Sequence, residues 1–152
     1  MKVAVLMGSA NDAEKMAGAK TMLERFGVEV EEHVMSAHRN PSDVAAFASG
    51  ARDAGYAVLI GGAGLAAHLA GVLASHTTLP VIGVPLSAPG GGGIANGLDA
   101  LLATVQMPSG IPVATVAVDG SKNAGILAAQ IIALSDPDVA KKLDEFKKGG
   151  AR

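Results

Sequence analysis

The sequence contains no cysteine, which excludes disulfide bonds, thiolate metal sites and a cysteine nucleophile. Tryptophan is also absent, and one tyrosine and three phenylalanines leave few aromatic rings on which a base or a flavin could stack. A basic excess is missing too, because 12 Lys and Arg stand against 14 Asp and Glu, for a net charge of −2. Proteins that bind duplex nucleic acid normally carry a positive excess, so we expect no nucleic-acid partner.

Long hydrophobic runs are also missing. Gly, Pro, His or a charged residue interrupts every apolar stretch well short of the roughly 18 residues that a membrane-spanning helix needs. The apolar start of the chain, residues 1–7, is too short for a signal peptide and has no cleavage pattern. We therefore expect a cytoplasmic protein with no membrane partner.

Apolar residues are nevertheless abundant. Hydrophobic residues make up 49% of the 152 positions before the 20 glycines are counted, whereas roughly 45–50% is usual with glycine included. Charged residues make up 17%, against about 25% in a typical domain. A single domain over residues 1–152 has too small an interior to hide this excess, so we expect the chain to form a homo-oligomer.

Short apolar runs alternate with stretches of helical periodicity along the chain. The runs predict strands at 3–7, 28–34, 56–60, 81–85 and 113–118. The periodic stretches predict helices at about 13–26, 41–51, 65–75, 98–104 and 122–134, and a last one through Val139, Leu143 and Phe146 before a frayed end. Strands that are mostly apolar throughout are typical of a buried parallel sheet. The sequence therefore predicts a single α/β domain, a three-layer α/β/α sandwich around a central parallel sheet.

Three loops deserve inspection, because open parallel sheets bind ligands at the carboxyl ends of their strands. The first loop, Gly8–Asp12, opens a helix, where backbone N–H groups and the helix dipole favour an anion. A plain turn with an Asn or Asp cap explains the same residues more simply. In the second loop, Ser36–Pro41, Arg39 has a fork that matches phosphate, and the adjacent His38 can move protons near neutral pH. A surface arginine and a structural histidine are an equally good interpretation.

The third loop, Gly61–His68, contains a formal match to the dinucleotide-binding glycine pattern. The match follows the third predicted strand, and no acidic residue lies about 20 positions further on, so a nucleotide-cofactor site is not indicated. A glycine turn that allows a ligand or a helix to approach closely is the better interpretation. His68 falls within the predicted helix, where a single histidine is more typical of a packing or interface residue.

Other signatures of chemistry are missing. No histidine or carboxylate spacing suits a metal, no G-x-S-x-G motif marks a hydrolase serine, and no Walker A sequence indicates ATP. We therefore predict no metal. The glycine run Gly90–Gly93 is expected to be a loop, and it is a candidate lid over the site.

Taken together and in order, these stretches resemble the family of 5-(carboxyamino)imidazole ribonucleotide mutase, an enzyme of purine biosynthesis. Eight stretches match in register and span nearly the whole chain: Met7-Gly8-Ser9 with Asp12, 36–39 with Pro41, 62–64 with 66–69, 80–85, 97–99, 105–108, 110–115, and Asn123-Ala124 before 127–131. The resemblance implies a flavodoxin-like sandwich that assembles as a homo-octamer, uses no metal or organic cofactor, and binds a ribonucleotide between subunits.

The resemblance also implies roles for residues of the three loops. His38 is the expected catalytic acid and base. The expected substrate-binding residues are Ser9, Asn11 and Asp12 in the first loop, Ser36, Ala37 and Arg39 in the second, and Gly64, His68 and Leu69 in the third. Of these, Ser9 and Arg39 are expected on the phosphate and Asp12 on the ribose, while the third loop lines the imidazole and carboxylate end.

The implied reaction moves a carboxylate from an exocyclic nitrogen to a ring carbon, by decarboxylation and recarboxylation in a closed pocket. This chain departs from many family members at Asn11, Leu65 and Ala70, where Ser, Gly and Pro are common, and over 88–96, which is longer and richer in glycine. One alternative is direct carboxylation of aminoimidazole ribonucleotide by CO2. That branch typically has Lys after the histidine and a Ser-Asn pair in the third loop, whereas Arg39 and 66–68 match the mutase branch. The other alternative is a non-catalytic or flavin-binding flavodoxin-like module.

Overall fold

The computed structural model describes residues 1–88 and 93–151, so most of the candidate glycine lid, Gly90–Gly92, lies outside the described residues. Within them, one sheet of parallel strands has the order β2-β1-β3-β4-β5. The strands are β1 (Lys2–Met7), β2 (Glu29–Val34), β3 (Tyr56–Gly64), β4 (Val81–Leu86) and β5 (Ala114–Thr115). This is the strand order of the flavodoxin-like doubly wound folds, as predicted.

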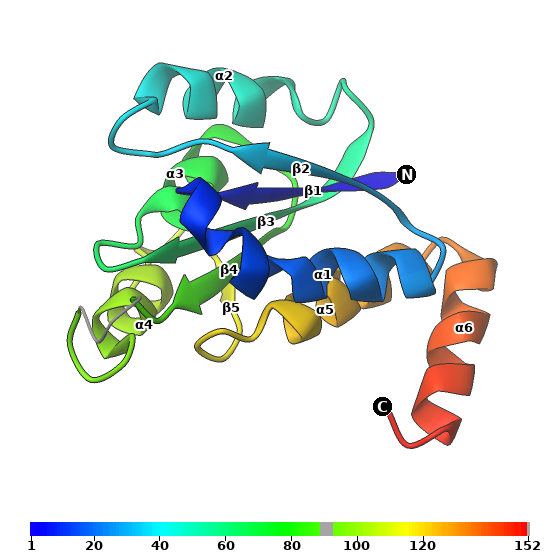
Figure 1. Ribbon diagram of the computed structural model, residues 1–152. Coiled ribbons are helices and arrows are strands. Elements are labelled where there is room, and N and C mark those ends of the chain that lie inside the picture. The colour runs from blue at the N-terminus through cyan, green and yellow to red at the C-terminus, as the bar shows by residue number, and fades with distance from the viewer. Residues whose placement is uncertain (89–92, 152) are drawn as a thin grey trace.

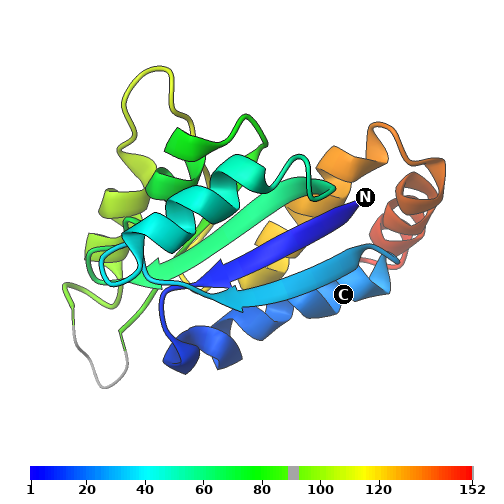
Figure 2. The same cartoon turned by 90° about the horizontal axis from the view of Figure 1, so that it is seen from above.

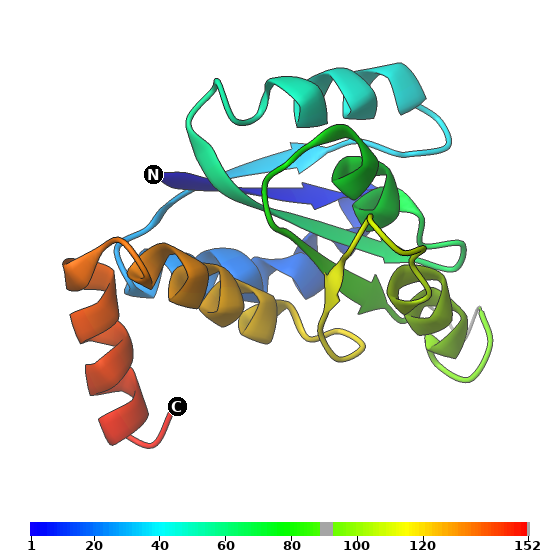
Figure 3. The ribbon, with the colours of Figure 1, turned by 180° about the vertical axis from the view of Figure 1, so that it is seen from behind.

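Helices cover both faces of the sheet (Figure 1). They are the 3-10 helix η1 (Ala10–Asp12), α1 (Ala13–Arg25), α2 (Pro41–Gly50), α3 (Leu69–His76), α4 (Leu98–Val105), α5 (Ser121–Ala133) and α6 (Pro137–Lys148). Figures 1 and 3 place α1 and α5 together on one face and α2 and α3 on the other. The predicted three-layer α/β/α sandwich is therefore confirmed. None of the helices within 1–88 and 93–151 is long and apolar enough to cross a membrane.

Two hydrophobic cores lie on the two faces of the sheet. Successive strand residues point to opposite faces, so Val5 packs into the core under α1 and α5, and Leu6 packs into the core under α2 and α3. All residues of β4 and all but the first of β1 are buried, which explains why these strands read as continuous apolar runs.

The glycines after the third predicted strand do not form a turn, which corrects the sequence-based interpretation. Strand β3 continues through them to Gly64. A Cβ atom on Gly62 would lie 2.3 Å from the sulfur of Met16 on α1, and one on Gly61 would lie 3.2 Å from the Cα of Ala70 on α3. A side chain at Gly62 would force Met16 to move, and one at Gly61 would press on α3, so both positions favour glycine because helices approach this strand closely on both faces.

The following helix begins later than predicted. Leu65 has a φ of 54°, in the left-handed region, and α3 begins only at Leu69. His68 therefore precedes the helix as its N-cap residue instead of lying within it. The fifth strand is also shorter than predicted, because only Ala114 and Thr115 are paired as a strand at the edge of the sheet.

Candidate active site

The carboxyl ends of β1, β2, β3 and β4 meet around a cavity of about 490 Å³. It is lined by Gly8, Ser9, Asn11, Asp12, Ser36, Ala37, His38, Arg39, Ala63, Gly64, Leu65, Ala66, His68, Leu69, Ser87 and Ala88. The structure brings all ten predicted site residues together on this one cavity, including His38 and the nine expected substrate-binding residues. The rule that parallel sheets bind ligands at their strand ends thus selected three loops that do converge.

The first loop is folded by its own backbone and by Ser9. The backbone N–H of Asn11 donates to Ser9 Oγ at 3.2 Å, and that of Asp12 donates to the Ser9 carbonyl at 3.0 Å. Asp12 is the N-cap residue of α1, but its side chain makes no capping hydrogen bond, which corrects the expected Asp cap. Its carboxylate instead lines the cavity.

The charge state of Asp12 is set by competing surroundings. Burial disfavours the ionised carboxylate and raises the pKa of Asp12 above its ordinary value. A hydrogen bond from the backbone of Ser9 and the positive charges of Lys15 and Arg39 act in the opposite direction and offset part of this rise. Burial is therefore the dominant influence on the pKa of Asp12, and the neighbouring groups offset only part of it.

Arg39 connects the second loop to the first. Its Nη2 donates to the carbonyl oxygen of Gly8 at 3.2 Å, and its backbone N–H donates to Ser36 Oγ at 3.2 Å. The backbone N–H of Asn40 donates to the Ser36 carbonyl at 2.8 Å, and Pro41 then begins α2. A guanidinium carries five N–H donors in a planar fork, so the single bond to Gly8 orients Arg39 and leaves donors for an anionic ligand.

His38 and His68 are in direct contact on the wall of the cavity. His38 Nε2 lies 2.8 Å from His68 Nδ1, and the two rings are close to perpendicular at 81°, with centroids 4.9 Å apart. In this hydrogen bond one nitrogen carries the hydrogen and the other accepts it. His68 is exposed on the cavity wall, so the packing interpretation that its sequence context favoured is wrong. The pair can pass a proton to and from a bound ligand.

Leu65 is a cavity residue at which this chain carries a strained backbone. Its φ of 54° is one that L-residues other than Asn and Asp rarely adopt, and its side chain is 52% exposed. The leucine side chain therefore occupies part of the cavity mouth without being buried in a core.

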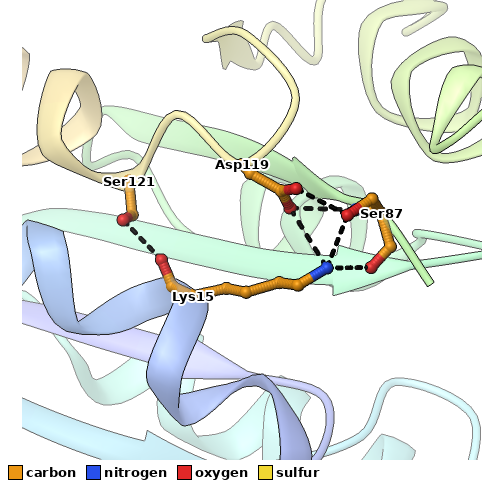
Figure 4. A network of polar contacts seen from close by, with 4 residues as sticks. All are labelled: Lys15, Ser87, Asp119 and Ser121. Carbon is orange, nitrogen blue, oxygen red and sulfur yellow. Dashed lines mark hydrogen bonds and ion pairs between the residues drawn. The ribbon is translucent and has the colours of Figure 1, made fainter. Parts of the chain in front are cut away.

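Sequence reasoning missed Ser87 and Ala88, which follow β4 and line the cavity. The strand-end rule would have found them if it had been applied to the fourth strand as well as to the first three. Ser87 is held by Lys15 from α1 and by Asp119 from the segment after β5 (Figure 4). Among residues 1–88 and 93–151, no three His, Asp or Glu side chains are placed to hold a metal ion.

Comparisons with known proteins place this geometry in context. A family model described as AIR carboxylase matches residues 2–152. Two relatives, each called N5-carboxyaminoimidazole ribonucleotide mutase, cover most of the chain. The Thermotoga maritima protein is 48% identical over 147 residues, which is 97% of this chain and 84% of the relative. The Bacillus subtilis protein is 49% identical over 148 residues, which is 96% of this chain and 89% of the relative.

Solved structures agree with the sequence comparison. A crystal structure of Treponema denticola PurE superposes with a TM-score of 0.86, at 27% identity, over 98% of this chain and 90% of that one. The similarity thus covers the sheet, its helices and the loops that line the cavity.

Proposed function

The chain belongs to the AIR carboxylase family, and from this premise we propose that it is an N5-carboxyaminoimidazole ribonucleotide mutase of purine biosynthesis, acting as a single domain over residues 1–152. The substrate is 5-(carboxyamino)imidazole ribonucleotide and the product is 4-carboxy-5-aminoimidazole ribonucleotide. Relatives at 48% and 49% identity that bear the mutase name favour this reaction over direct carboxylation and over a non-catalytic module.

The observation that carries the proposal is the histidine pair on the same cavity as an anion-binding loop. At one end of the nucleotide, Ser9, Asn11, the backbone at the start of the first helical turn and the fork of Arg39 supply donors for the phosphate. The carboxylate of Asp12 accepts from the ribose hydroxyls. Ser36 and Ala37 support the ligand from the second loop.

His38 acts as the acid and then the base. The bond between the exocyclic nitrogen and the carboxylate carbon breaks, its electron pair stays on nitrogen, and His38 supplies the proton that nitrogen takes up. The ring carbon then attacks the released CO2, and His38 accepts the proton that leaves this carbon. The histidine ends in the state in which it began, so the reaction is an isomerisation without ATP, metal or organic cofactor.

His68, Gly64 and Leu69 form the end of the cavity that receives the carboxylate and the imidazole. The hydrogen bond between His68 Nδ1 and His38 Nε2, at 2.8 Å, holds the ring of His38 in one orientation through both proton transfers. Small residues at Ala63 and Ala66 leave space in which CO2 stays beside the ring. Holding the two reactants together removes several kcal/mol of the barrier to recombination, of the order that proximity supplies.

The test is an assay of the purified chain without ATP. Formation of the carboxylated ring product is monitored by its ultraviolet absorbance. One reaction contains the carbamate substrate at low bicarbonate, and the other contains aminoimidazole ribonucleotide with added bicarbonate. Rapid product from the carbamate is the expected result. Product only at high bicarbonate would instead assign the chain to direct carboxylation, and product from neither would overturn the proposed reaction.

We further propose that the enzyme is a homo-octamer in the cytoplasm. Self-association is supported by an apolar stripe on α4, where Leu98, Leu102 and Val105 are 42%, 48% and 48% exposed on one face of the helix. In Figure 2, α4 lies at the end of the molecule toward which the strands point. The cytoplasmic location follows from the substrate, because a phosphorylated nucleotide does not cross membranes unaided. Sedimentation of the wild type and of Leu102→Asp tests the assembly, and a monomeric wild type would contradict it.

A further inference from the structure

One polar network reaches the cavity from outside the three predicted loops (Figure 4). Lys15 Nζ donates to the carbonyl oxygen and to Oγ of Ser87, both at 2.5 Å, and lies 3.6 Å from Asp119 Oδ1. The Asp119 carboxylate accepts from the Ser87 backbone N–H at 3.0 Å and from Ser87 Oγ at 2.5 Å. Lys15 and Asp119 therefore clamp both the backbone and the side chain of Ser87, which lines the cavity.

Close contacts between α1 and α5 hold Lys15 in place. We call Lys15 and Asp119, with their bonds to Ser87, the clamp. Ser121 Oγ, at the start of α5, donates to the carbonyl oxygen of Lys15 at 2.5 Å (Figure 4). Further along the two helices, a Cβ atom on Gly125 would lie only 2.5 Å from the carbonyl oxygen of Ala19. α1 and α5 thus touch backbone to backbone, and Lys15 is held in place relative to the sheet.

At the other end of this network, Asp119 has a left-handed backbone conformation. Asp119 has a φ of 56°, and its backbone N–H donates to the carbonyl oxygen of Pro85 at 2.9 Å, which ties it to the end of β4. Burial alone would raise the pKa of Asp119, but hydrogen bonds from Ser87 and the charge of Lys15 outweigh burial and lower it. Asp119 therefore stays ionised, and its carboxylate accepts both hydrogen bonds from Ser87.

The contacts of Lys15 distinguish a positioning role from direct binding. An ammonium group has three N–H donors, and three acceptor atoms of Ser87 and Asp119 already surround this one. Lys15 itself does not line the cavity, whereas Ser87 does. The charge of Lys15 also acts on Asp12, one helical turn earlier, which lines the cavity beside the first loop.

We propose that Lys15 is a positioning residue for the sugar end of the bound nucleotide. It fixes the cavity wall at Ser87 and Ala88, and it places a positive charge beside the carboxylate of Asp12. The assignment of Asp12 to the ribose rests on the proposed function, whereas the fixing of the wall does not.

The kinetic arm of the test compares Lys15→Met with Lys20→Met. Lys20 lies on the same helix, away from the cavity, and its Nζ forms an ion pair with Glu32 Oε2 at 2.9 Å. Lys20→Met also removes an ion pair and is therefore a matched control. Lys15→Met is expected to raise KM about tenfold and to change kcat less than about twofold, because ground-state and transition-state binding weaken together. Lys20→Met leaves both constants unchanged. Lys15→Arg, which retains the charge and the donors, recovers most of the lost affinity.

The second arm needs no substrate. Carboxyl NMR of the free protein gives the pKa of Asp12, and amide hydrogen exchange gives the protection of Ser87. Removing the positive charge in Lys15→Met is expected to raise the pKa of Asp12 and to speed exchange at the Ser87 amide. The rise in KM on acidification should then begin at a higher pH than in the wild type.

The outcomes separate this inference from the proposed function. If Lys15→Met keeps the wild-type KM, Asp12 pKa and Ser87 protection, the positioning role is overturned. It is equally overturned if kcat and the melting temperature fall while KM and the two NMR readouts stay unchanged, because Lys15 would then be a folding residue. If the wild type turns over neither substrate but the NMR changes appear, the proposed function fails and the fixing of the wall by Lys15 stands.

Discussion

His38 Nε2 and His68 Nδ1 are 2.8 Å apart, so two histidines from loops thirty residues apart share one hydrogen. His38 lies in the loop after β2 and His68 is the N-cap residue of α3, and the two rings are hydrogen-bonded to each other. Each ring therefore depends on the other for its orientation. Replacing His38 and replacing His68 should therefore lower kcat by different amounts.

Replacing the proposed acid and base removes turnover and spares binding. His38→Asn is expected to lower kcat by roughly 10²–10⁴-fold, the usual contribution of a positioned general acid and base. Affinity for the nucleotide product, measured by calorimetry, should change little, because the phosphate and ribose contacts remain. Turnover at the wild-type rate would show that His38 is not the proton carrier.

His68 is expected to act mainly through the orientation of His38. His68→Leu loses the hydrogen bond and should lower kcat roughly tenfold, close to the net worth of one hydrogen bond, whereas His68→Gln retains a partner and should lose less. The control is His76→Leu, which replaces an exposed histidine at the C-terminal end of α3 and leaves kcat unchanged. Equal losses in the Leu and Gln variants would argue against an orienting hydrogen bond.

Arg39 is expected to recognise the phosphate. Arg39→Met should raise KM for the nucleotide by roughly 10–100-fold, as charge-assisted hydrogen bonds contribute about 1.5–3 kcal/mol. Binding of the corresponding nucleoside, which lacks the phosphate, should hardly change. The control is Arg52→Met, because Arg52 donates to Thr78, away from the cavity. A similar loss for nucleotide and nucleoside would contradict a phosphate contact.

Asp12 is expected to lower the thermal stability of the protein at pH 7 and to contribute to binding of the ribose. Its folded-state pKa is raised by burial, so the folded state holds its proton more tightly than the unfolded chain does. The resulting stability is present at pH values below the unfolded pKa and is lost as pH rises through the raised folded pKa. Asp12→Asn should therefore melt at a higher temperature than the wild type at pH 7, with the difference vanishing in acid. The same variant should bind the ribose poorly.

Replacing Leu65 with glycine is expected to stabilise the folded protein. Leu65→Gly relieves the left-handed strain, which costs roughly 1–2 kcal/mol, and gives up little burial because the side chain is 52% exposed. Part of this gain is offset by the flexibility of glycine, so we expect about 0.5–1 kcal/mol more stability in urea unfolding. Leu134→Gly is the control, because Leu134 is 88% exposed but has an ordinary φ of −62°. It should not stabilise the protein.

The layered fold and the candidate loops could be predicted because their signals are local. The buried run 3–7 and the stripe of Met16, Ala19 and Leu23 each identify an element within a few residues. The resemblance to a family then singled out particular residues in the loops at the strand ends.

The errors come from distant packing that no short window contains. Gly61 and Gly62 have the local signature of a turn, but they pair with β1 and β4 in the sheet, and Met16 and Ala70 approach them from opposite faces. The periodicity predicts a helix through His68 because the left-handed conformation of Leu65 has no signature in the apolar pattern. The clamp on Ser87 joins residues 32 and 72 positions apart, so neither partner could be inferred from its surroundings in the chain.

The close contact between α1 and α5 also sets the order in which a working cavity can appear during synthesis. Every residue predicted to touch the substrate lies before residue 70, yet the wall at Ser87 is held by Asp119, and Lys15 is held by Ser121. A nascent chain that ends before these residues carries the full set of predicted reactive groups without the scaffold that aligns them. Catalytic competence therefore arrives late, when the last quarter of the polypeptide has left the ribosome and docked.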